Sequence, residues 1–173
     1  SDGAVTTVAD GDNLGSIKFC GADGTDIQNA TATIKAVVNG TVSGNTVPTD
    51  LVFETSPSNN TNRLERARIT SGGRVLIGTD TARTIAARNP FFQVEGINTD
   101  GSSISLTRNQ ANGNGPTLNF LKTRGTSDGA VTIVQDGDNV GTINFAAADG
   151  TDAISKVAMI RAEIDGTPGE NDT

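Results

Sequence analysis

Short apolar bursts alternate with polar turns along the whole chain. The bursts are rich in β-branched residues or alternate apolar with polar positions, and Gly, Asn, Asp and Ser fill the gaps between them. Those turn residues accept positive φ or bond to nearby backbone. The pattern is typical of an all-β protein with short antiparallel strands. The predicted strands are 5–8, 15–19, 32–38, 50–56, 65–69, 74–78, 91–96, 102–108, 117–124, 131–134, 141–146 and 158–164.

Two stretches carry more local detail. ERARI (65–69) and RVLIG (74–78) flank TSGG, which predicts a hairpin with a glycine turn. In SSISLTR (102–108), apolar and polar residues alternate, which indicates a strand with one buried face. TDTARTIAARN (79–89) alone leans towards helix, and we expect a linker or one short helix there.

The beginning of the chain is repeated near its end. Residues 1–47 align without a gap on residues 127–173, and 25 of the 47 positions are identical. A period of 126 residues is much longer than the roughly 20–50 residues of solenoid repeats, so we expect tandem modules. The first residue is Ser1, and we interpret the chain as a window on a longer polypeptide.

The pattern divides the chain into four parts. Residues 1–79 are expected to form a β module that ends in the hairpin, and 80–89 form the linker or short helix. Residues 90–126 form a second β sub-block, and 127–173 begin the next repeat.

The apolar content is low for a chain of this length. Leu, Ile, Val and Phe make up about a fifth of it, near the level at which disorder becomes a concern, and Trp and Tyr are absent. The ordered strand pattern argues against disorder. We therefore expect identical chains to supply the rest of each core, as they do in obligate oligomers.

Charge restricts the possible partners. The net charge of −7 and the pI near 4.4 disfavour nucleic acid and anionic lipid. No apolar run approaches the roughly 18 residues of a membrane span, so we expect no membrane insertion. Cys20 is the single cysteine, and Ala146 stands at its position in the second copy, so no disulfide framework is expected.

Several motifs resemble those of tailed-phage fibres. RLERARITSGGRVLIGT (63–79) is similar to a hairpin that often precedes the next module or a chaperone-type C-terminus in such fibres. The runs at 91–96, 102–129, 133–152 and 162–172 resemble repeat modules of marine-type phage fibres. This resemblance implies an intertwined, elongated homotrimer at the virion surface, outside the cell.

Catalytic chemistry finds little support in the sequence. Histidine is absent, which removes His-based catalysis and His metal sites. Paired carboxylates could still serve a glycosidase, but no Trp or Tyr offers a sugar platform. The carboxylate candidates are Glu54, Glu65, Glu95 and Glu163. We expect no enzyme activity and no cofactor.

Acidic turns are the candidates for a metal site. Asp10 and Asp12 recur as Asp136 and Asp138, and GADGTD (21–26) recurs as AADGTD. A Ca²⁺ loop uses such oxygen ligands, but the EF-hand spacing fails. We interpret both motifs as Asx turns and expect no metal.

Arginines cluster beside a glutamate at 63–68. Arg63, Arg66 and Arg68 stand near Glu65. Either an inter-chain ladder of ion pairs or a solvated face would explain them.

The leading hypothesis is a structural shaft or spacer module of a trimeric phage tail fibre used in host attachment. A glycan- or receptor-binding module would use exposed loops such as 98–101 or 110–116. A polysaccharide depolymerase and a subunit of a non-viral extracellular filament are two further hypotheses.

Overall fold

The computed structural model describes residues 3, 5–27, 30–58 and 62–169, and in this part of the chain it is an all-β protein without α-helix. The chain divides into two compact units, Ser1–Arg83 with Asn89–Ser103 and Thr84–Arg88 with Ile104–Thr173. The elements are β1 (Asn13–Cys20), β2 (Ala30–Val38), β3 (Thr49–Thr55), β4 (Leu64–Ile69), β5 (Val75–Ile77), β6 (Phe92–Val94), a 3₁₀ turn (Asp100–Ser102), β7 (Asn139–Ala146) and β8 (Lys156–Glu163).

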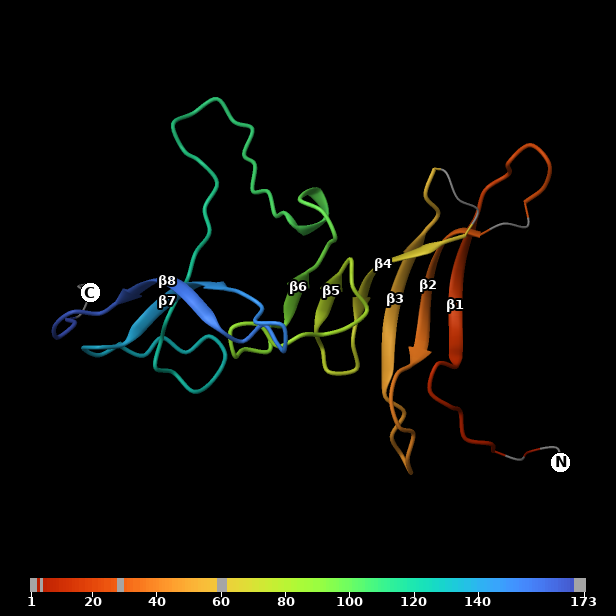
Figure 1. Ribbon diagram of the computed structural model, residues 1–173, viewed down its shortest axis with the longest axis horizontal. Coiled ribbons are helices and arrows are strands. Elements are labelled where there is room, and N and C mark those ends of the chain that lie inside the picture. The colour runs from red at the N-terminus through yellow and green to blue at the C-terminus, as the bar shows by residue number, and fades with distance from the viewer. Residues whose placement is uncertain (1–2, 4, 28–29, 59–61, 170–173) are drawn as a thin grey trace. The chain divides into compact units, whose positions relative to one another are not determined.

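The first unit is one six-stranded sheet in which the strands lie in sequence order (Figure 1). Pairing is antiparallel from β1 to β5, as the sequence predicted, whereas β6 joins β5 in parallel. The predicted hairpin at 65–78 is confirmed as β4–β5. Its turn is closed by a hydrogen bond from Gly73 N to Thr70 O (2.8 Å), and the φ of 78° at Gly73 explains the glycine.

Three rungs of paired residues cross all six strands. Two rungs are apolar throughout and, being two residues apart, lie on the same side of the sheet; we call this side the apolar face. Its rungs are Gly15–Ala36–Leu51–Ile69–Val75–Phe92 and Ile17–Ile34–Phe53–Ala67–Ile77–Val94. The rung between them, on the opposite side, is Ser16–Lys35–Val52–Arg68–Leu76–Gln93.

The side opposite the apolar face is the one that the chain itself covers. Val52 and Leu76 are fully buried there, and Gln93 is buried as well. The Gln93 side chain accepts a hydrogen bond from Arg83 N (3.0 Å) and donates to Arg83 O (3.0 Å) and Pro90 O (3.3 Å). These bonds fix the backbone of the segment before β6 beside the middle rung.

The second unit contains the β7–β8 hairpin, which repeats the β1–β2 hairpin. Each Cα pair of β7–β8 has the residue numbers of a β1–β2 pair raised by 126, and both register shifts recur. Ile17 with Ile34, for example, becomes Ile143 with Ile160. Sequence similarity between the two ends of the chain is thus accompanied by the same strand register.

The 79–89 stretch forms a turn instead of the short helix that was one of two expectations. Ile85 and Arg88 form an isolated bridge around Ala86 and Ala87, whose φ angles are 50° and 59°. Two positive φ angles define the tight hairpin turn that usually contains Asn and Gly. Ala86 is buried, and its N–H donates to Ala153 O at 3.0 Å, which holds the turn in place.

Four predicted strands have no ladder partner among the described residues: 5–8, 102–108, 117–124 and 131–134. All residues of 102–108 are exposed, so the buried face predicted for that segment is not present in the described chain. A strand also requires a neighbour for its backbone groups, which apolar alternation does not supply. Between Ser103 and Thr123, one backbone hydrogen bond joins described residues, from Asn112 N to Gln110 O (2.9 Å).

Candidate assembly interface

The apolar face of the first unit is open. Five of its large side chains are 39–62% exposed, whereas Val52, Leu76 and Gln93 of the middle rung are buried; the five are Ile17, Phe19, Leu51, Ile69 and Phe92. Contiguous exposed apolar patches mark interaction sites on soluble proteins. Burying the exposed half of each of these five side chains would contribute about 1 kcal/mol apiece, or about 5 kcal/mol per chain.

Extended segments of the second unit are similarly uncovered. Ile104, Leu106, Leu118, Leu121 and Val131 all have exposed side chains. Because their backbone N–H and C=O groups also lack ladder partners within the described chain, these segments can accept strands from another chain. Both the side chains and the backbone therefore favour self-association.

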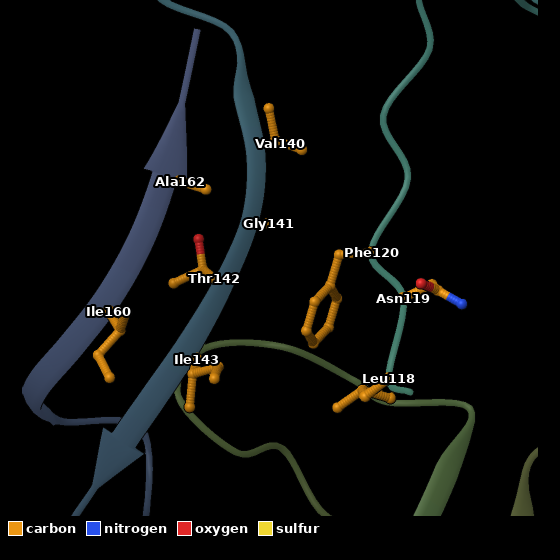
Figure 2. Close-up of a pocket in the computed structure, with 9 residues that line it drawn as sticks. All are labelled: Leu118, Asn119, Phe120, Val140, Gly141, Thr142, Ile143, Ile160 and Ala162. Atoms are coloured by element: carbon orange, nitrogen blue, oxygen red, sulfur yellow. The ribbon is translucent and has the colours of Figure 1, made fainter. Parts of the chain in front are cut away.

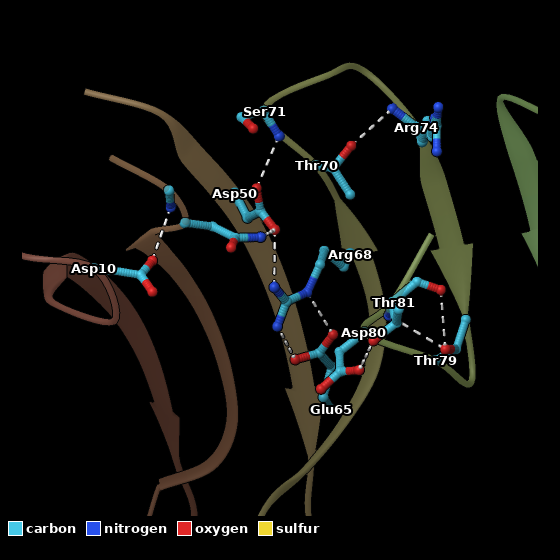
Figure 3. Close-up of polar contacts among 12 residues, drawn as sticks. Asp10, Asp50, Glu65, Arg68, Thr70, Ser71, Arg74, Thr79, Asp80 and Thr81 are labelled. Carbon is cyan, nitrogen blue, oxygen red and sulfur yellow. Dashed lines mark hydrogen bonds and ion pairs between the residues drawn. The ribbon is translucent and has the colours of Figure 1, made fainter. Parts of the chain in front are cut away.

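A buried carboxylate organises the side opposite the apolar face (Figure 3). Asp50 is fully buried and accepts hydrogen bonds from Arg68 Nη1 (2.8 Å), Asn39 Nδ2 (2.6 Å) and Ser71 N (2.8 Å). Arg68 also donates to both carboxylate oxygens of Glu65, each at 2.8 Å. Glu65 and Asp50 together raise the pKa of the Arg68 guanidinium above its usual value. This network joins β3, β4 and the turn after β4.

The arginines at 63–68 have partners within the chain, and Arg66 is exposed, as a solvated face would have it; the inter-chain ladder of ion pairs stays a prediction. Arg68 is only 14% exposed and is bound as described above. Arg63 lies 3.5 Å from Glu54 and donates to Ala30 O, and Arg66 donates to the hydroxyl of Thr55 at 3.0 Å. Glu65 lies on the same strand as Arg68, but the other partners of these arginines come from other strands and depend on the register, which the sequence does not give.

The four carboxylate candidates lie on or next to different elements. Each of them is paired with a basic side chain: Glu54 with Lys35 and Arg63, Glu65 with Arg68, Glu95 with Arg83, and Glu163 with Arg161. Glu54 and Glu65 are register partners on β3 and β4, whereas Glu95 follows β6 and Glu163 ends β8.

The acidic turns bind their own backbone, in the same way in both copies. Asp10 accepts from Gly40 N and Asp136 from Gly166 N, both at 2.8 Å. Asp12 accepts from Ala9 N (2.8 Å). Among the described residues, no group of three or more acidic, His or Cys residues could hold a metal ion.

The second acidic motif forms the predicted Asx turn, whereas the aspartates of the first motif accept from an earlier residue and from across the hairpin. Asp23 accepts from the N–H groups of Thr25 (2.7 Å) and Asp26 (3.0 Å), and Asp149 accepts from those of Thr151 and Asp152. These backbone bonds lower the pKa values of both aspartates, with the bond from the more distant residue having the larger effect. Cys20 is a free, exposed thiol at the end of β1.

The loop at 98–101 closes on itself. Asn98 Oδ1 accepts from Gly101 N at 2.8 Å, and a methyl group on Gly96 would lie 2.4 Å from the carbonyl carbon of Gly101. The chain therefore passes over itself without room for a side chain at Gly96. The 110–116 loop is exposed throughout.

Phe120 and its neighbours lie on the apolar side of the β7–β8 hairpin (Figure 2). Figure 2 shows the Phe120 ring beside Gly141 and Ile143, in a shallow pocket that Leu118 and Ile160 also line. A methyl group on Gly141 would lie 2.8 Å from Phe120 Cβ, so glycine is what allows this approach. The sequence contains one weak signal of this site. Gly141 recurs as Gly15, and in both copies the glycine stands at a strand position whose neighbours on the same side are apolar.

An ion pair anchors the same segment to the turn before β7. Arg124 donates to both oxygens of Asp138, at 2.7 and 2.8 Å. The Arg124 hydrogen bonds, aided by the N–H of Gln135, lower the pKa of Asp138 to about 2. Segment 117–124 thus contacts the hairpin at Phe120 and the turn before it at Arg124.

Comparison with known proteins identifies the fold. No family model matches the chain, and no curated protein matches it. Among solved structures, it is similar to the carboxy-terminal domain of the L-shaped tail fibre of bacteriophage T5. The TM-score is 0.74, the sequence identity is 14%, and the match covers 99% of this chain and 72% of that one. The all-β fold is therefore shared with a phage tail fibre domain. No described helix is long and apolar enough to cross a membrane.

Proposed function

We propose that this protein is a structural shaft module of a homotrimeric phage tail fibre, located at the virion surface and contributing to host attachment by spacing and support. The apolar face carries the proposal. A sheet with two apolar rungs open to solvent on one side and an ion-pair network on the other is suited to packing against copies of itself.

Three features support a trimer over a self-sufficient monomer. The exposed rungs need a cover, the extended segments need backbone partners, and the fold resembles that of a tail fibre domain. Three chains around one axis supply the first two together, because each chain offers both an apolar face and unpaired segments. The 126-residue period of the sequence, with its shared hairpin register, favours modules in series along such a shaft.

Sedimentation equilibrium tests the proposal directly. The chain mass is 17.7 kDa, and we expect a species of three times that mass. A folded monomer at micromolar concentration would contradict it.

A charge on the apolar face provides the matched variant. Ile69 lies in the middle of one apolar rung and is 40% exposed, while Val47 lies outside the strands and is 45% exposed. Ile69→Glu should dissociate the trimer, because an unpaired charge buried between chains costs several kcal/mol, as much as the face contributes. Val47→Glu should leave the mass unchanged.

A further inference from the structure

The β1–β2 hairpin carries an uncovered copy of the position that Phe120 covers on β7–β8. We define the Gly15 site as Asp12, Gly15, Ile17, Ile34 and Ala36, the residues that correspond to Asp138, Gly141, Ile143, Ile160 and Ala162. The two hairpins have the same register and the same bulges, so the backbone offers the same shape at both positions.

The occupied position shows what the site recognises. Phe120 lies against the bare backbone of Gly141, and Ile143 and Ile160 line the pocket around it (Figure 2). Arg124 adds a bidentate ion pair to Asp138, whose side chain is left 13% exposed. An aromatic contact at a glycine and a charged contact about four residues later therefore define the bound segment.

At the Gly15 site the same features are present, but no phenylalanine or arginine segment of the described chain is bound to them. Among the described residues, no heavy atom outside the chain neighbours of Gly15 lies within 4 Å of the point where its side chain would start. Ile17 is 62% exposed. Asp12 is exposed, its Oδ2 accepts from Ala9 N as Asp138 Oδ2 does from Gln135 N, and no described arginine binds it.

We propose that the Gly15 site binds a second copy of this chain's own segment 117–124, with its phenylalanine on Gly15 and its arginine on Asp12. In series, the segment would come from the preceding repeat, because residue 126 of one unit is in phase with the residue before Ser1 of the next. The hairpin and the preceding segment together form the joint between modules. This inference rests on the two hairpins and not on any viral role. It assigns the β1–β2 end of the apolar face to the preceding segment, so that the part of the face on β3–β6 is left for other chains.

The test is an extended chain in which residues 104–126 precede Ser1 of the full chain. Glycines are labelled with ¹³C at Cα, and the Hα resonances of Gly15 and Gly141 are compared by NMR. A phenylalanine ring beside a glycine shifts its Hα resonance, so Gly141 serves as an internal reference. Matched extensions carry Phe→Leu at the position of Phe120 or Arg→Gln at that of Arg124.

We expect Gly15 to move to the resonance position of Gly141 when the native extension is added. The Phe→Leu extension should abolish the shift, and the Arg→Gln extension should reduce the fraction of shifted Gly15 signal. Three results would overturn the inference: Gly15 unmoved while Gly141 is shifted, Gly15 already shifted without the extension, which would mean that another surface occupies the site, or an equal shift with the Phe→Leu extension.

Discussion

Replacing Asp50 with alanine should destabilise the first unit strongly. The substitution removes a fully buried carboxylate that accepts from Arg68 Nη1, Asn39 Nδ2 and Ser71 N, of which Asn39 and Ser71 belong to exposed residues. Removing one partner of a buried ion pair typically costs about 3–5 kcal/mol. Arg68 keeps its two bonds to Glu65 and retains some exposure, so we expect the lower end, about 3 kcal/mol.

Thermal unfolding followed by circular dichroism in the β-sheet region measures this effect, because the chain has neither Trp nor Tyr for fluorescence. A unit of this size loses about 4–8 °C in Tm per kcal/mol, so the midpoint should fall by about 12 °C or more. All variants are compared at one chain concentration, since association makes Tm concentration-dependent.

Two further variants give the experiment its control. Asp50→Asn keeps the volume and one acceptor oxygen, and it should lie between the alanine variant and the native chain. Glu163→Ala removes an exposed ion pair with Arg161, in which both side chains are at least 40% exposed, and should cost less than about 1 kcal/mol. If Asp50→Ala unfolds as late as Glu163→Ala, the network does not stabilise the sheet.

Three other predictions follow from local geometry. Ala87→Gly should stabilise the second unit by about 1 kcal/mol in urea unfolding, because alanine has a positive φ there; a loss of stability would refute the strain. Gly78→Ala should destabilise far more than Gly11→Ala, since both glycines have φ near 80° but a methyl group at Gly78 meets Glu95 O at 2.3 Å; equal midpoints would contradict the clash. The pKa of Asp138 is lowered to about 2 from 3.8, so its ion pair contributes fully above pH 3.8 and is lost as the pH falls towards 2. Amide protection in the segment that it anchors, taken relative to the intrinsic exchange rate at each pH, should fall only in that window, and unchanged protection would exclude the linkage.

The sequence predicted the strands that pair within the chain, because alternation and turn residues are local signals. Residues 65–78 carried both signals and formed the expected hairpin. The 102–108 and 117–124 segments carry the same alternation, but pairing depends on a neighbour that the pattern does not identify. The division at 79 and 89 stays a prediction, and so does the number of modules in series.

The sequence did not reveal the ion-pair partners for the same reason: these partners depend on how the strands pair. Lys35 meets Glu54 because β2 and β3 are in a particular register, and Asp50 meets Arg68 across β3–β4. The turn at Ala86 and Ala87 has no turn-forming residue at all; contacts elsewhere, such as that from Ala86 to Ala153, impose it. A period-two pattern thus shows on which face of a sheet a residue lies, whereas the strand register determines which residues it contacts.

Strand β1 is an edge strand of the six-stranded sheet. Its ladder with β2 is interrupted near both ends, between Asn13 and Gly15 and between Phe19 and Cys20. Only a short stretch of regularly paired backbone remains in β1, and Lys18 lies within it. Edge strands that are interrupted by bulges and carry a lysine pair poorly with strands of other molecules. The chain is consequently less prone to associate laterally through β1 than a long, regular edge strand would make it.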